Sequence, residues 1–99
     1  MARFDVYANP DGNGFLVDVQ ADLMSHLNSR LVIPLVASGI APLPMKILNP
    51  AFQIEDATYL LLTQQMAAVS AQMLKRPVLN LNVRRDEIVA AIDLLLQGF

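Results

Sequence analysis

Two short apolar segments, separated by a dense turn signal, constrain this chain most. Residues 3–8 alternate in polarity, with Phe4, Val6 and Ala8 on one face, and residues 15–20 alternate in the same way. Between them, residues 9–14 combine proline, aspartate, two asparagines and two glycines, which fix or permit turn conformations. The sequence therefore predicts a β-hairpin at the start of the chain.

Further strand patterns follow, each bounded by turn residues. Residues 30–36 predict a strand in which Pro34 cannot donate to a ladder, so we expect it at an edge or a bulge. Residues 37–51 predict a long connection with one short strand near residues 45–48. A second hairpin is expected from residues 52–54 and 57–63 around a turn at Glu55 and Asp56, and residues 69–74 predict another strand.

The last segment has the period of a helix. Its apolar positions follow the i, i+3, i+4, i+7 spacing of a buried stripe and are Ile88, Ala91, Ile92 and Leu95. Asn82 is expected to cap the N-terminus, Asp86 and Glu87 to lie at the positive end of the dipole, and Gly98 to end the helix. The chain is therefore predicted to form one domain over residues 1–99, mainly β (β+α): a small strand-rich barrel with one C-terminal α-helix.

The composition favours a second buried surface. The chain has 99 residues, of which 55% are hydrophobic and 16% charged. A monomer of this size buries only about 65% of its unfolded surface, so we expect a homodimer interface to cover the excess apolar area. No apolar run approaches the roughly 18 residues of a membrane span, the N-terminus lacks a signal-peptide pattern, and there is no cysteine. We therefore expect a cytoplasmic protein with no membrane contact.

The charged and polar residues do not predict a catalytic or metal site. Net charge is −2 with scattered basic residues, which argues against direct nucleic-acid binding. His26 is the only histidine, and its neighbour Ser25 cannot easily face it as a nucleophile faces a base. One histidine without cysteine also argues against a metal. We expect no catalytic residue, no metal and no cofactor.

Three separated segments carry a family pattern. They read Val-Asp-Val-Gln-Ala-Asp at residues 17–22, Arg-Leu-Val-Ile-Pro-Leu at residues 30–35, and an apolar helix at residues 87–98. Together they resemble the CcdB family, and Thr-Gln-Gln-Met at residues 63–66 is similar to its chromosomal branch. The resemblance covers nearly the whole chain and is weakest over residues 37–53. It implies a small SH3-like β-barrel with a secondary sheet, a C-terminal helix and a two-fold dimer.

The resemblance implies a toxin of a type II toxin–antitoxin system that is not an enzyme. In this family the toxin dimer enters the cleft of the DNA gyrase A-subunit dimer. Its C-terminal residues stack on a gyrase arginine and trap the gyrase–DNA cleavage complex. A CcdA-like antitoxin folds onto the toxin and extracts it, as suits a coupled folding and binding partner. Nucleic acid is contacted only through the antitoxin complex.

Carried over to this sequence, the resemblance assigns two sets of residues. The gyrase-binding residues would be Gln97, Gly98, Phe99, Asp93, Leu95, Leu23 and Met24. The antitoxin-binding residues would be Asn9, Asp11 and Asn13, in a loop slightly shorter than the family's. The best-known toxins carry tryptophan where this chain has Gln97, and stacking of an aromatic ring on a guanidinium contributes about 0.5–2 kcal/mol. Phe99 replaces a terminal isoleucine and offers an aromatic ring nearby.

Alternatives remain open at this point. Leu23 and Met24 also fit ordinary core, and residues 97–99 also fit a plain helix end. Gln97 is compatible with a non-toxic homologue that binds only the antitoxin. Because a fold does not fix a function, a MazF-like endoribonuclease is a further alternative, with Arg30 and Thr63 as its candidate residues.

Overall fold

The predicted N-terminal hairpin is confirmed. The computed structural model describes residues 1–41 and 43–98, and begins with β1 (Asp5–Ala8) paired antiparallel to β2 (Phe15–Asp18). Gly14 closes their loop with φ +69°, and a Cβ at this position would lie 2.1 Å from the carbonyl oxygen of Leu35. Only glycine fits this close approach of loop and strand.

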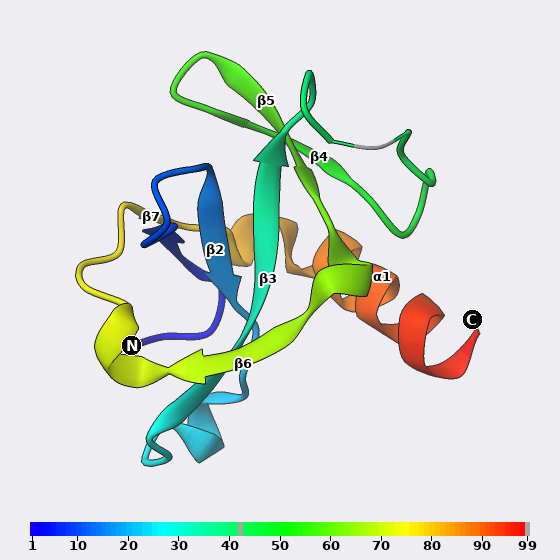
Figure 1. Ribbon diagram of the computed structural model, residues 1–99. Coiled ribbons are helices and arrows are strands. Elements are labelled where there is room, and N and C mark those ends of the chain that lie inside the picture. Colours follow the sequence, from blue (N-terminus) through cyan, green and yellow to red (C-terminus); the bar gives the residue numbers. More distant parts are fainter. Residues whose placement is uncertain (42, 99) are drawn as a thin grey trace.

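The long strand β3 (Ser29–Ala37) organises the sheet (Figure 1). One side pairs with β2, and the other pairs first with β6 (Ala67–Ser70) and then with β5 (Ala57–Leu61). Pro34 lies in this central strand, so its predicted place at an edge or a bulge is wrong. Its carbonyl accepts from Leu62 N–H at 2.9 Å. The nitrogen of Pro34 therefore points to the same side of β3. On that side Pro34 lies in the gap between the residues paired with β6 and those paired with β5, so no backbone N–H is needed there for strand pairing.

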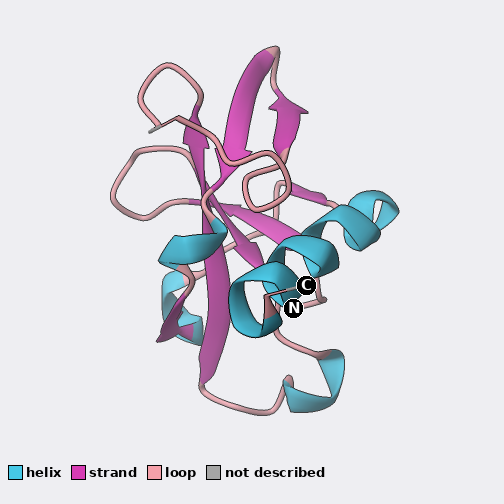
Figure 2. Ribbon diagram, turned by 90° about the vertical axis from the view of Figure 1, so that its right-hand side faces the viewer, coloured by secondary structure: helices cyan, strands magenta, loops and turns pink. Residues whose placement is uncertain are grey.

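The remaining strands complete a curled antiparallel sheet with the order β4-β5-β3-β2-β1-β7 and with β6 paired to β3. Strand β4 (Ala51–Ile54) forms the second predicted hairpin with β5, and both turn residues, Glu55 and Asp56, have positive φ. Strand β7 (Leu79–Asn80) pairs with β1. The result is a mainly β half-barrel with one C-terminal helix, as predicted (Figure 2).

Three local predictions were wrong. No strand forms near residues 45–48, which make a turn. The strand expected at residues 69–74 is β6, which begins earlier, and it gives way to the 3₁₀ turn η3 (Ala71–Met73). Asn82 does not cap the helix with its side chain; it begins the 3₁₀ turn η4 (Asn82–Arg84), and its N–H donates to Asn80 Oδ1 at 2.7 Å.

Helix α1 (Arg85–Gln97) covers one face of the sheet and carries most of the predicted stripe, but Leu95, which was predicted to be buried, is 39% exposed near the helix end. Ile88 and Ala91 are fully buried, and Ile92 packs against the same core. That core joins the inward residues of most strands: Val6, Val17, Ile33, Leu35, Phe52 and Leu61. At the start of the helix, Arg84 lies 4.1 Å from the centre of the Phe52 ring. The C-terminal end of α1 projects past the strands (Figure 1).

Candidate functional site

The apolar pair after β2 lies at the surface. Asp22–Met24 form the 3₁₀ turn η1, in which no residue is buried. Leu23 is 85% exposed and Met24 is 46% exposed, so their interpretation as ordinary core is wrong. Full burial of such a side chain contributes about 1.5–3 kcal/mol. The turn therefore offers an apolar contact to a partner.

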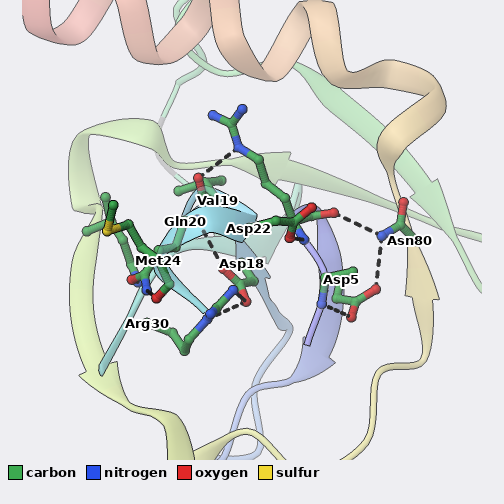
Figure 3. Close-up of polar contacts among 11 residues, drawn as sticks. Asp5, Asp18, Val19, Gln20, Asp22, Met24, Arg30 and Asn80 are labelled. Atoms are coloured by element: carbon green, nitrogen blue, oxygen red, sulfur yellow. Dashed lines mark hydrogen bonds and ion pairs between the residues drawn. The ribbon is translucent and has the colours of Figure 1, made fainter. Parts of the chain in front are cut away.

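Polar contacts attach this turn to the sheet. The Gln20 side chain donates from Nε2 to the carbonyl of Met24 at 2.8 Å and accepts through Oε1 from Leu31 N–H at 3.0 Å. Asp22 Oδ1 accepts from the backbone N–H of Arg3 at 2.8 Å. Gln20, Asp22 and Met24 are grouped beside the start of β3 in Figure 3. None of the η1 residues is buried, so side-chain hydrogen bonds hold this turn against the sheet.

The end of α1 has the predicted glycine stop. Gly98 has φ +80°, the left-handed conformation that suits glycine, and donates to the carbonyl of Leu94 at 3.0 Å. Gly98 is exposed. Phe99, which was also assigned to gyrase binding, lies outside the described residues.

The last turn of α1 presents a mixed polar and apolar surface. Gln97 Nε2 donates to Asp93 Oδ1 at 3.5 Å, so the two predicted site residues face the same side of the helix. Leu95 is 39% exposed and Leu96 is 69% exposed. Leu96 was not among the predicted site residues. In both ribbon views this helix end lies apart from η1, so one chain does not join the two surfaces (Figures 1 and 2).

The loop between β1 and β2 borders a groove of about 450 Å³. Asn9, Asp11 and Asn13 all line it, together with the mostly apolar residues Pro34, Val36, Ala37, Ile40 and Tyr59. Asn9 Oδ1 accepts from Asp11 N–H at 3.2 Å, and Asp11 Oδ1 accepts from Asn13 N–H at 3.0 Å. The structure thus brings the three predicted antitoxin-binding residues to one rim.

A buried ion pair lies on the face of β2 and β3 that carries a second, smaller apolar cluster, made of Tyr7, Leu16, Val32 and Leu74, opposite the core beneath α1. Arg30 and Asp18 are both fully buried, with Nη2–Oδ2 at 2.6 Å and Nε–Oδ2 at 2.8 Å (Figure 3). Burial raises the pKa of the Asp18 carboxyl, and the hydrogen bonds from Arg30 and from Gln20 N–H oppose that rise.

The Tyr7 hydroxyl is buried nearby with no hydrogen-bond partner among the described residues. Burial, and then the negative charge of Asp5, raise the pKa of Tyr7.

The residues proposed for RNA cleavage are not accessible. The guanidinium of Arg30 is buried and paired with the carboxylate of Asp18. Thr63 is fully buried, and its hydroxyl donates to the carbonyl of Leu48 at 2.6 Å. Neither side chain can reach a phosphate in this conformation. Among residues 1–41 and 43–98, no three His, Cys, Asp or Glu side chains are grouped to hold a metal, and no helix has the length and apolarity to cross a membrane.

A family comparison covers nearly the whole chain. The model of the family described as CcdB protein matches residues 3–98. The chain belongs to the CcdB family. This family comprises toxins of toxin–antitoxin systems. Membership confirms the resemblance found at residues 17–22, 30–35 and 87–98.

The CcdB resemblance did not identify every residue that shapes these surfaces. The sequence placed Gln20 only in an alternating strand segment, and no local pattern pointed to its side-chain contacts with Leu31 and Met24. Leu96 lies at the i+8 position of the stripe that starts at Ile88, where the helical period predicts burial, yet it is 69% exposed because the last turn of α1 projects past the strands (Figure 1). Both residues add to the surfaces that this CcdB family member presents.

Proposed function

We propose that this chain is the toxin of a toxin–antitoxin pair, that it binds the DNA gyrase A subunit and traps the gyrase–DNA cleavage complex, and that a CcdA-like antitoxin neutralises it. The observation that carries the proposal is the exposure of the apolar turn at Leu23 and Met24 in a chain of this family. The toxin acts by occupying a surface of another enzyme, without cofactor or catalytic group.

The proposed gyrase contact has two parts. The first is η1, where Leu23 and Met24 supply apolar area. The second is the end of α1, where Asp93, Leu95 and residues 97–99 would meet the gyrase arginine. Gln97 cannot stack as an aromatic ring does, so hydrogen bonding and the ring of Phe99 would take over this contact. The long, weak Gln97–Asp93 contact within the helix would open when gyrase binds.

A homodimer would carry two copies of η1 and two copies of the α1 end. Large apolar side chains are exposed in several regions of the chain, among them Ile40, Leu43 and Val83 at 76%, 94% and 92%. Where a two-fold contact gathers such side chains into one patch, the second copy would cover them. A two-fold axis would place a second η1 and a second helix end on the same assembly, and each copy would present the same patch.

The groove beside the β1–β2 loop is the proposed antitoxin site. Its apolar floor and the polar rim of Asn9, Asp11 and Asn13 suit an extended or helical segment with apolar side chains and neighbouring donors. A disordered antitoxin segment that folds into this groove would give up conformational entropy on binding, which keeps the interaction reversible.

Titration calorimetry of the purified chain against the gyrase A subunit tests this proposal. The full chain should bind, and a variant ending at Leu96 should lose most of the affinity while keeping its circular dichroism spectrum and melting temperature. Absence of binding by the full chain, combined with tight binding of the antitoxin, would favour the non-toxic homologue instead.

A further inference from the structure

The turn η1 keeps a defined shape without a hydrophobic anchor. None of its residues is buried, and its internal hydrogen bonds are the short-range ones of a single 3₁₀ turn. Isolated turns of this kind are only marginally stable in water. Another interaction must therefore hold Leu23 and Met24 in place, and the Gln20 side chain lies where it can do so.

Gln20 continues the β2–β3 ladder with its side chain. The last ladder contact is Val19 N–H to the carbonyl of Leu31 at 2.9 Å, and beyond it the chain turns away into η1. The Gln20 amide then accepts from Leu31 N–H and donates to the carbonyl of Met24. One planar group thus bonds a strand and a turn at once. The Gln20 backbone N–H is itself bonded to Asp18 Oδ1 at 3.0 Å, which connects it to the buried ion pair (Figure 3).

We infer that Gln20 is a positioning residue that pre-organises the Leu23 and Met24 surface for its protein partner. This inference rests on the proposed function, because the partner is the gyrase A subunit. The free turn already has the bound shape, so the partner does not have to order it on contact. Pre-organisation of this kind raises affinity by reducing the entropy lost on binding. The same Gln20 amide bonds the backbone of Leu31, whose side chain is itself 37% exposed.

The substitution Gln20→Ala removes both side-chain hydrogen bonds and leaves the apolar residues in the chain. We expect about tenfold weaker binding to the gyrase A subunit, the loss that follows when one turn with two large side chains must be ordered on binding. Hydrogen exchange should quicken at the Leu31 amide and across Asp22–Met24. The matched control is Gln53→Ala, which removes an exposed glutamine bonded to Thr58 Oγ1 at 2.6 Å in the distant β4–β5 hairpin. This control should bind as the wild type does.

A double-mutant cycle separates positioning from general stability. In the background Leu23→Ala/Met24→Ala, Gln20 has no apolar pair to position, so adding Gln20→Ala should lower the affinity no further. An equal loss in both backgrounds, or wild-type affinity of Gln20→Ala, overturns the positioning role while the proposed function stands. Absence of gyrase binding by the wild type overturns the proposed function, and this inference with it.

Discussion

Removal of one partner of the buried ion pair should destabilise the fold strongly. In Arg30→Met, Asp18 keeps only the Gln20 N–H as a partner, because both short contacts of its Oδ2, at 2.6 and 2.8 Å, come from Arg30. Both side chains are fully buried, so water cannot replace the lost cation. Leaving an uncompensated buried charge costs about 3–5 kcal/mol. With a urea m-value of about 1–3 kcal/mol/M, the midpoint should fall by at least about 1 M.

The assay is urea unfolding followed by circular dichroism, at pH 7 and at acidic pH. Loss of Arg30 raises the pKa of Asp18 further above its unfolded value. A folded-state pKa above the unfolded one contributes stability at low pH that is lost as pH rises through the folded pKa. The deficit of Arg30→Met should therefore be largest at pH 7 and shrink on acidification.

The double variant Asp18→Val/Arg30→Met tests the cause of that deficit. Since it buries no charge, its free energy of unfolding should recover to within about 1.5 kcal/mol of the wild type. A loss below about 1 kcal/mol in the single variant, or a double variant as unstable as the single one, would show that an unpaired buried charge does not cause the loss.

Three further changes have distinct outcomes. Tyr7→Phe removes a buried hydroxyl without a partner and should raise the free energy of unfolding by about 1 kcal/mol in urea; a decrease would show that the hydroxyl is hydrogen-bonded in solution. The hydrogen bonds from Arg84 lower the pKa of Glu87, so Glu87 adds stability above its unfolded pKa that is lost as pH falls through the folded value. Glu87→Gln should cost about 0.5 kcal/mol at pH 7 in thermal unfolding, and a cost that persists at pH 2 would contradict this. Gln97→Trp should tighten gyrase binding about 2- to 30-fold in calorimetry by restoring arginine stacking, and unchanged affinity would show that the contact is already made.

The sequence predicted those parts of the fold that depend on neighbouring residues. The two hairpins follow from local alternation and turn residues, and the stop at Gly98 follows from its conformational freedom. Strand β7 was missed because it has only two residues and exists through pairing with Asp5 and Val6, far away in the sequence. Helix capping by Asn82 failed for a related reason. Asn80 bonds the Arg3 carbonyl and Asp5 Oδ1 through Nδ2 (Figure 3). Its own Oδ1 accepts from Asn82 N–H.

The candidate site was predictable in its residues but not in its exposure. An apolar pair after a strand is compatible with core or surface, and only the three-dimensional course of the chain after β2 places Leu23 outside. The role of Gln20 was hidden because it depends on Leu31, which approaches only when β3 pairs with β2. Burial of Arg30 could not be predicted either, because it depends on the pairing of β2 with β3, which brings Asp18 beside it.

Gyrase-mediated cleavage of supercoiled plasmid, with ATP and the purified protein, is the decisive assay for gyrase poisoning. We expect linear DNA to accumulate with the full chain, and not with a variant ending at Leu96 or with Leu23→Ala/Met24→Ala. The Gln53→Ala variant, altered away from both surfaces, should trap cleaved DNA as the wild type does. Full trapping by the variant that ends at Leu96, or no linear DNA with the intact chain and gyrase from its own source, would contradict the account.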